Sequence, residues 1–183
     1  MRLFTGIDLA PQVIAKLTGL LARLKPTASI NWSPPENLHI TTKFIGQWPE
    51  ERLPELTAAL QSLAPRDPIS IAVEKLGFFP NPHSPRVFWA GVYSSDGLAR
   101  LARDIEAALA PLGIAKEERP YSPHLTLARI KNPGKQPSLL QAVAALPSLD
   151  FGEFVADGFC LFHSRTAPSG SVYTKLSEFP FAK

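Results

Sequence analysis

Two short stretches of the chain place a histidine two residues before a threonine. In PENLHITTKFIG the pair is His39 and Thr41, and in PYSPHLTLARI it is His124 and Thr126. The chain has only 4 histidines, so this pattern uses half of them. An imidazole titrates near about pH 6.5 and can serve as a general acid or base, while a threonine hydroxyl can donate a hydrogen bond to a phosphoryl oxygen. Together the two pairs have the groups needed to cleave a phosphate ester.

The alternation of side chains along a β-strand sets which residues can share a site, because residues i and i+2 point to one face. His39, Thr41 and Lys43 are predicted to share a face, where Lys43 would offset the charge of a phosphate. In the second stretch the same alternation points Arg129 away from His124, unless a bulge turns it back.

A structural interpretation of these histidines has to be considered as well. A single His-x-Thr on a strand is usually a half-buried histidine with a satisfied hydrogen bond, but two copies at corresponding places favour chemistry. Metal binding by His39 and His124 is an alternative, although neither motif offers a cysteine or carboxylate at ligand spacing and Lys43 would repel a cation. His83, in NPHSP, is predicted to be an exposed loop residue. His163, in LFHSRT, can line the cleft or end a strand, and we favour the strand end.

The elements that position the motifs alternate between strands and helices. Pro54 is predicted in the first turn of its helix, and Asp96 at the N-cap of the next. Each half of the chain contains one His-x-Thr, which indicates an internal duplication. Strands are predicted at 2–8, 37–46, 69–79, 86–93, 124–130, 151–163 and 171–179, and helices at 11–24, 49–63, 97–113 and 137–147.

The composition is that of an ordinary globular protein of 183 residues, with 45% hydrophobic and 19% charged residues. The net charge of +3 permits an anionic ligand, but no run of lysine or arginine marks a nucleic-acid tail. The single cysteine, Cys160, excludes an internal disulfide and a cysteine-rich metal site. No apolar run reaches the roughly 18 residues needed to span a bilayer, and no signal peptide is recognisable. We therefore expect a cytoplasmic protein without a membrane partner.

Paired His-x-Thr motifs on strands of two similar lobes resemble the two-histidine phosphoesterase superfamily. Within it the chain resembles the bacterial and archaeal RNA 2′,3′-cyclic phosphodiesterases, historically called 2′-5′ RNA ligases. The resemblance runs nearly end to end, through RLFTGIDLA, NWSPPENLHITTKFIG, PRVFWAGV, RPYSPHLTLARI and GSVYTKLSEFPF. One departure is Thr42, which stands where an apolar residue is commoner and should face the core. We expect an α+β fold with one domain over residues 1–183, in which two pseudo-symmetric, intertwined lobes each place an antiparallel sheet and flanking helices around a central cleft.

The resemblance implies metal-independent hydrolysis of RNA 2′,3′-cyclic phosphate ends to 2′-phosphomonoesters, without a cofactor or an obligatory protein partner. His124 would be the general base (the proton acceptor) and His39 the general acid (the proton donor), with Thr41 and Thr126 holding the phosphoryl oxygens. The residues alone do not distinguish the acid from the base. In reverse, the same site could join RNA ends by 2′-5′ ligation without ATP, and no P-loop pattern is present. The substrates would be RNA ends, with tRNA fragments among the candidates.

Further residues have two interpretations each. Arg129 belongs to the family's second motif, which suggests a place near the site, whereas strand alternation suggests the far face. Tyr121 and Phe79 can stack on a terminal base or can pack structurally, and Arg86 can contact phosphate or form a loop salt bridge. Two other functions remain open: hydrolysis of a small cyclic nucleotide or ADP-ribose cyclic phosphate, and a non-catalytic RNA-binding module.

Overall fold

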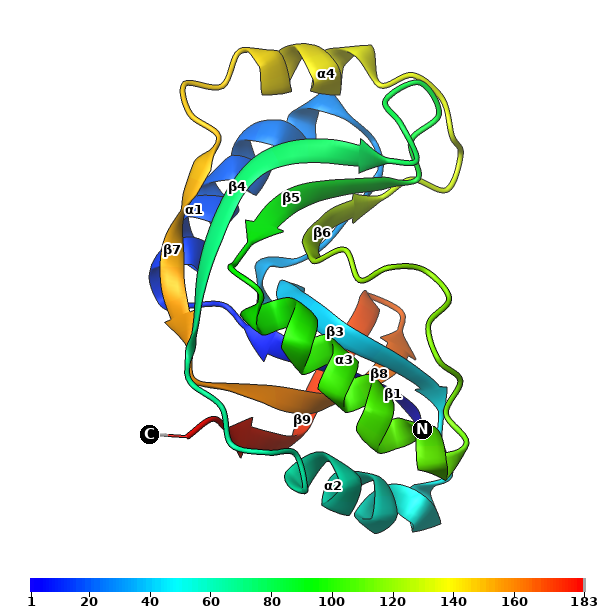
Figure 1. The fold of residues 1–183 in the computed structure, drawn as a ribbon. Helices are drawn as coiled ribbons and strands as arrows, with labels where there is room; N and C mark the ends of the chain where they lie inside the picture. The colour runs from blue at the N-terminus through cyan, green and yellow to red at the C-terminus, as the bar shows by residue number, and fades with distance from the viewer. Residues whose placement is uncertain (183) are drawn as a thin grey trace.

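A computed structural model describes residues 1–182, which fold into two antiparallel β-sheets with helices packed on them (Figure 1). The predicted α+β class with two sheet-and-helix lobes is confirmed. The strands are β1 (Arg2–Asp8), β2 (Asn31–Trp32), β3 (His39–Gln47), β4 (Ile69–Phe79), β5 (Val87–Tyr93), β6 (His124–Arg129), β7 (Asp150–Ala156), β8 (Gly158–Ala167) and β9 (Gly170–Pro180). The α-helices are α1 (Pro11–Leu24), α2 (Leu53–Gln61), α3 (Gly97–Leu109) and α4 (Pro137–Ala144).

The two sheets draw strands from both ends of the chain. The first sheet has the order β3-β1-β8-β9, and the second has the order β2-β6-β5-β4-β7. The helices cross over as well: α1 follows β1 of the first sheet but packs on β7 of the second, while α3 follows β5 of the second sheet but packs on β3 of the first. Each lobe therefore depends on the other half of the sequence.

The helices are held by apolar stripes that face the sheets. In α1 the buried residues recur at helical spacing, and Pro11 occupies its first turn, where a missing N–H costs little. In α3 the stripe runs from Leu98 through Leu101 and Ile105 to Leu109, all fully buried. Burying each such leucine or isoleucine side chain contributes about 1.5–3 kcal/mol to the free energy of folding, relative to leaving it exposed. Among residues 1–182, no helix combines the length and the apolar character that crossing a bilayer requires.

Most predicted elements form where the sequence indicates, with two corrections. The run 151–163 is two strands, because the chain leaves the second sheet after Ala156 and enters the first at Gly158. A Cβ at Gly158 would lie 2.8 Å from the carbonyl oxygen of Phe179, so the close approach at this crossing requires glycine. Asp96 does stand at the N-cap of α3, but its carboxylate makes no capping bond and instead accepts from Arg100 at 3.1 Å. Pro54 lies in the first turn of α2 as predicted.

Candidate active site

The two motif strands meet at the edges of their sheets. β3 is the outermost strand of the first sheet, and β6 is flanked by β2 only near Arg129, so the His124 end of β6 has no neighbour on that side. The two strands contact each other between the lobes. The Tyr121 hydroxyl, just before β6, donates to the Thr41 carbonyl of β3 at 2.8 Å. The strand edges therefore bring together two motifs that are far apart in sequence.

Both histidines are held by the same backbone contact. Nδ1 of His39 lies 2.6 Å from the carbonyl oxygen of Asn37, and Nδ1 of His124 lies 2.8 Å from that of Ser122. A carbonyl can only accept, so Nδ1 carries the hydrogen in both rings and Nε2 is left for chemistry. In the first motif, Nε2 of His39 already lies 2.9 Å from the hydroxyl oxygen of Thr41.

Aromatic side chains enclose His39. The ring centroid of Phe4 lies 4.7 Å from that of the imidazole, and Tyr173 meets it edge-on at 5.2 Å. Gly6 lies beneath the ring, where a Cβ would be 2.9 Å from the carbonyl oxygen of Ile40. A side chain at position 6 would push β1 and β3 apart, so glycine here allows the His39 ring to pack closely on β1.

This enclosure affects the proton affinity of His39. Burial lowers its pKa below the ordinary value, because the charged imidazolium loses hydration. The carbonyl of Asn37 and the carboxylate of Asp8 oppose the shift by favouring the charged form. Arg129 and His124 lower the pKa further, since each adds positive charge nearby. These influences reach His39 from both lobes, so one electrostatic environment includes both motifs.

The surroundings of His124 are different. The edge of Phe79 meets the imidazole at a centroid distance of 5.1 Å, and Phe79 in turn packs on Trp89 at 5.2 Å. Gly77 allows this arrangement, because a Cβ there would lie 2.2 Å from the Trp89 ring. Trp89 pairs with Thr126 across β5 and β6, so it forms the floor beside the second motif. Sequence reasoning missed Trp89, although the alternation of the strand at 86–93 sets it apart from the buried Phe88.

A bulge in β3 overturns the prediction for Lys43. Lys43 pairs with Thr5 and Thr41 with Gly6, so Thr42 is an extra residue and the alternation of faces reverses beyond it. Lys43 is buried, with its ammonium bonded to the Glu106 carboxylate of α3. The prediction that Lys43 shares the face of His39 is therefore wrong.

Thr42 and Lys43 are both held on the core side of the bulge. The Thr42 hydroxyl is buried against that of Thr5 at 2.7 Å, which agrees with the predicted core-facing position. Lys43 also donates to the carbonyl oxygen of Ala115 at 2.8 Å. Its charge is neutralised beneath α3, on the opposite side of β3 from His39.

The same kind of bulge in β6 decides the position of Arg129. Ala128 pairs with Phe88 and Thr126 with Trp89, so the alternation reverses at Leu127 and Arg129 becomes exposed on the face of Thr126. Its charge acts on His39, which places it near the first motif. Simple strand alternation gave the wrong face for Arg129.

Two of the remaining predicted residues have structural contacts. The ring of Tyr121 packs against the core, and burial raises the pKa of its hydroxyl, so the residue joins the two lobes by packing and by its bond to Thr41. Arg86 lies at the entrance to β5, and its guanidinium reaches the carbonyl oxygen of Lys131 at 3.4 Å. These contacts favour the packing interpretation of Tyr121 and a loop contact for Arg86.

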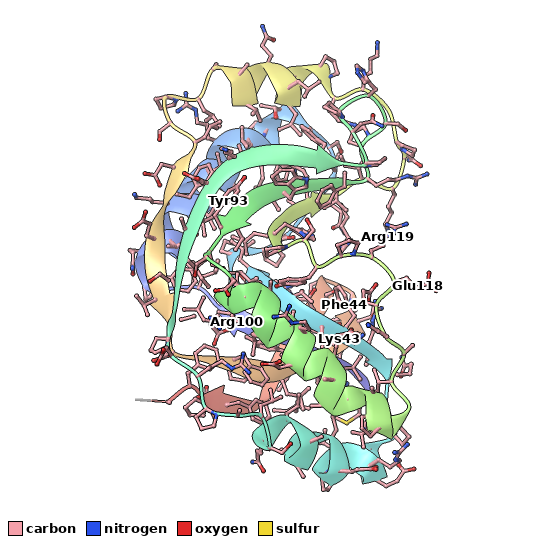
Figure 2. All side chains as sticks on the ribbon, in the orientation of Figure 1. Lys43, Phe44, Tyr93, Arg100, Glu118 and Arg119 are labelled. Carbon is pink, nitrogen blue, oxygen red and sulfur yellow. The ribbon has the colours of Figure 1, made fainter. Side chains whose placement is uncertain are left out.

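A pocket of ≈ 450 Å³ opens beside β3 and is lined by Lys43, Phe44, Ile45 and the segment 114–119. Figure 2 labels four of these residues, Lys43, Phe44, Glu118 and Arg119. Phe44 follows the β3 bulge, is 57% exposed and lies 6.3 Å from the ring of Phe4, so it shares the face of His39. Over residues 1–182, no group of three or more histidine, cysteine, aspartate and glutamate side chains is arranged to hold a metal ion.

Comparison with known proteins extends this picture. The family described as LigT like phosphoesterase matches residues 7–89 and 92–173. The chain belongs to the LigT-like phosphoesterases. An Archaeoglobus fulgidus protein named RNA 2′,3′-cyclic phosphodiesterase is 35% identical over 179 residues, which cover 98% of this chain and 99% of that protein. A Methanocaldococcus jannaschii protein of the same name is also 35% identical, over 98% of this chain and 100% of its own length.

Solved structures of LigT-like phosphoesterases and this chain share one fold. The crystal structure of TT0787 from Thermus thermophilus has a TM-score of 0.83 and 34% identity, covering 99% of this chain and 98% of that one. The structure of Escherichia coli LigT complexed with 3′-AMP has a TM-score of 0.81 over 100% of this chain and 98% of that one. At 23% identity it supports the fold alone.

Proposed function

We propose that this LigT-like phosphoesterase hydrolyses RNA 2′,3′-cyclic phosphate ends to 2′-phosphomonoesters, with His124 as general base and His39 as general acid. The observation that carries the proposal is the matched anchoring of the two imidazoles, each held through Nδ1 by the carbonyl two residues before it. Both Nε2 atoms are thereby available for proton transfer at the edges where the two lobes meet. The name of the relatives, RNA 2′,3′-cyclic phosphodiesterase, supports the choice of substrate.

The reaction needs two proton transfers on either side of the phosphorus. Nε2 of His124 takes a proton from water as the water oxygen bonds to phosphorus. The bond from phosphorus to the 3′-oxygen breaks, and Nε2–H of His39 gives its proton to that oxygen. The products are a 2′-phosphomonoester and a free 3′-hydroxyl, and exchange with solvent restores both histidines.

Charge on the phosphate is held by groups of both motifs. Thr41 and Thr126 donate hydrogen bonds to the non-bridging oxygens, and Arg129 supplies the positive charge that the sequence had suggested for Lys43. Negative charge develops on these oxygens in the transition state, where preorganised donors act most strongly. The bound anion also favours the protonated form of His39, which offsets the lowering of its pKa by burial.

The single chain contributes both histidines, so the site does not require a second subunit. A 5′-hydroxyl in place of water would give ATP-independent 2′-5′ ligation, which we propose as a secondary reaction of the same groups. RNA strand ends, with tRNA fragments among them, are the proposed substrates.

The test is to incubate the protein, in EDTA, with a short RNA that ends in a 2′,3′-cyclic phosphate and to map the product. We expect a 2′-phosphate. His39→Ala and His124→Ala should each lower kcat by about 10²- to 10⁴-fold, the usual range for a general acid or base. Circular dichroism of both variants controls for folding.

Each other outcome has a distinct meaning. Turnover that is equal in wild type and both variants would refute the roles of the histidines. Activity lost in EDTA and restored by a divalent ion would support a metal-dependent reaction. RNA binding without turnover would leave a non-catalytic binding module, and turnover restricted to a small cyclic nucleotide would change the substrate.

A further inference from the structure

We propose that Lys75 and Tyr93 form a subsite for a second phosphate of the RNA strand, next to the phosphate that is hydrolysed. The inference rests on the proposed function, because it takes the substrate to be an RNA end. It concerns the part of the second sheet that lies beyond His124, on the face that carries the catalytic groups.

The strand register places Tyr93 on the catalytic face. In β5, the alternate residues Trp89, Gly91 and Tyr93 point to one side, and Gly91 is paired with His124. Tyr93, labelled in Figure 2, thus lies on that face just beyond Gly91, the residue opposite His124. Its side chain is 41% exposed. A large half-exposed aromatic side chain here is accessible to whatever occupies the site.

The Tyr93 ring folds back toward the histidine. A Cβ added at Gly91 would lie 2.8 Å from Cε2 and 3.0 Å from the hydroxyl oxygen of Tyr93, so the phenol lies over Gly91. Only glycine leaves that space free. Because Gly91 is paired with His124, the hydroxyl lies over the residue next to His124 in the sheet.

A backbone bulge directs Lys75 to the same place. The register of β4 against β5 skips Lys75, which lies between Glu74 and Leu76. Its φ is 66°, and it is the one non-glycine residue of 1–182 with positive φ, a conformation that side chains other than glycine rarely adopt. The Lys75 N–H donates to the carbonyl oxygen of Leu149 at 2.8 Å, which fixes the bulge. The ammonium lies over the ring of Tyr93, 5.3 Å from its centroid.

Within residues 1–182, Lys75 forms no salt bridge and the Tyr93 hydroxyl forms no hydrogen bond. The Lys75 ammonium and the Tyr93 hydroxyl lie together beside Gly91, and both can donate hydrogen bonds to a phosphate oxygen. Tyr93 and Glu153 both line a pocket of ≈ 340 Å³, and Glu153 lies on β7, on the side of β5 away from β6, where its charge would repel an anion. The phosphate is therefore expected on the His124 side of the ring.

Spacing makes this a subsite for the next nucleotide. β4 and β6 are two strands apart in the sheet, a separation of about 10 Å. A cyclic mononucleotide has a single phosphorus and cannot occupy both positions. Lys75 and Tyr93 should therefore increase turnover of cyclic-phosphate ends on RNA strands of two or more nucleotides, relative to cyclic mononucleotides.

The experiment compares kcat/KM for a trinucleotide ending in a 2′,3′-cyclic phosphate with kcat/KM for the cyclic mononucleotide of the same base. Lys75→Ala should lower the trinucleotide value by about three- to tenfold at low salt and flatten its salt dependence by roughly 0.7 in log–log slope, the value for one contact on a single strand. The mononucleotide value should not change. Tyr93→Phe should cause a smaller loss with the trinucleotide alone. Lys16→Ala, which removes an exposed charge from α1, is the matched control.

Three results would overturn the subsite. One is an unchanged trinucleotide value in Lys75→Ala, and another is an equal loss with both substrates; in either case activity of the wild type keeps the proposed function intact. If the wild type turns over neither substrate, the proposed function fails, and anisotropy with a fluorescent single-stranded RNA then tests the subsite. Equal affinity of wild type and Lys75→Ala would refute it, and weaker binding by the variant alone would support it.

Discussion

The two motif strands share a backbone plan but differ in what they place beyond the threonine. In both, the imidazole is anchored to the carbonyl two residues before it, and in both a bulge follows. In β3 the bulge buries Lys43 and exposes Phe44, whereas in β6 it buries Ala128 and exposes Arg129. The anchoring of the imidazole is thus duplicated, while the next outward-facing position is aromatic in one lobe and cationic in the other.

The buried positions of the two strands also differ in a way that separates stability from function. The Lys43 ammonium pairs with the carboxylate of Glu106 in α3. This ion pair holds a helix from one half of the chain on a sheet strand from the other half. Ala128, its counterpart, is simply packed. A cation that strand alternation places beside a histidine, Lys43, is therefore buried in an ion pair, and one that alternation points away, Arg129, is exposed on the face of Thr126.

The largest effect should come from breaking the buried pair of β3. In Lys43→Met we expect the free energy of unfolding to fall by about 3 kcal/mol, because the largely buried Glu106 carboxylate loses its cationic partner and keeps only the Glu117 N–H. Urea denaturation measures the loss. The double variant Lys43→Met/Glu106→Leu should recover much of it, since no lone charge remains. If Lys43→Met is as stable as wild type but turns over RNA more weakly and with less salt dependence, Lys43 contacts the substrate and the structural role is refuted.

Removing the exposed cation of β6 should affect catalysis and leave stability unchanged. Arg129→Ala is expected to lower kcat/KM for an RNA cyclic-phosphate end by about a hundredfold, the typical cost of one donor to developing charge. Arg129→Lys should restore part of it, because a point charge lacks the fork geometry of guanidinium. The midpoint of urea unfolding is the control. Full activity in Arg129→Ala would mean that exposure on this face has no catalytic consequence.

Much of the fold could be predicted from sequence because its signals are local. The leucine spacing of α1 and the run Ile69–Phe79 indicated their elements directly. The crossing at Asp157, which separates β7 from β8, was not predictable, because a continuous apolar run does not show which sheet each part joins. The two-residue strand β2 was missed for a similar reason: it exists only through its pairing with β6.

The site shows the same limit. His39 and His124 stand out from residue type and spacing, whereas the faces of Lys43 and Arg129 depend on bulges. A bulge is defined by the register between two strands, as between Thr5 and Gly6 of β1 and their partners in β3. The sequence of one strand alone therefore does not predict it. The resemblance suggested a place near the site for Arg129, and the bulge at Leu127 puts Arg129 on the face of Thr126.

A smaller effect is expected where the two motifs are joined. Tyr121→Phe removes the hydroxyl that donates to the Thr41 carbonyl and keeps the ring that packs on the core. We expect a loss of about 1 kcal/mol in unfolding free energy, the usual value of one partly buried hydrogen bond, with a modest fall in kcat. Urea unfolding and steady-state kinetics measure both. A change in KM alone, at full stability, would instead favour stacking of Tyr121 on a base.

The smallest effect concerns the proton affinity of His39, and it tests whether charge crosses between the lobes. Burial lowers the pKa of His39, Asp8 raises it, and Arg129 lowers it. Arg129→Met should therefore raise this pKa and Asp8→Asn should lower it, as followed by NMR titration of the imidazole C–H signals. Because the pKa of folded His39 is depressed, the neutral ring stabilises the fold above the unfolded pKa of about 6.5, and this contribution is lost as the pH falls below it. In Arg129→Met the fall in unfolding free energy at low pH should be smaller, because the pKa of His39 is less depressed. An unchanged titration in Arg129→Met would show that the arginine of the second motif does not act on the histidine of the first.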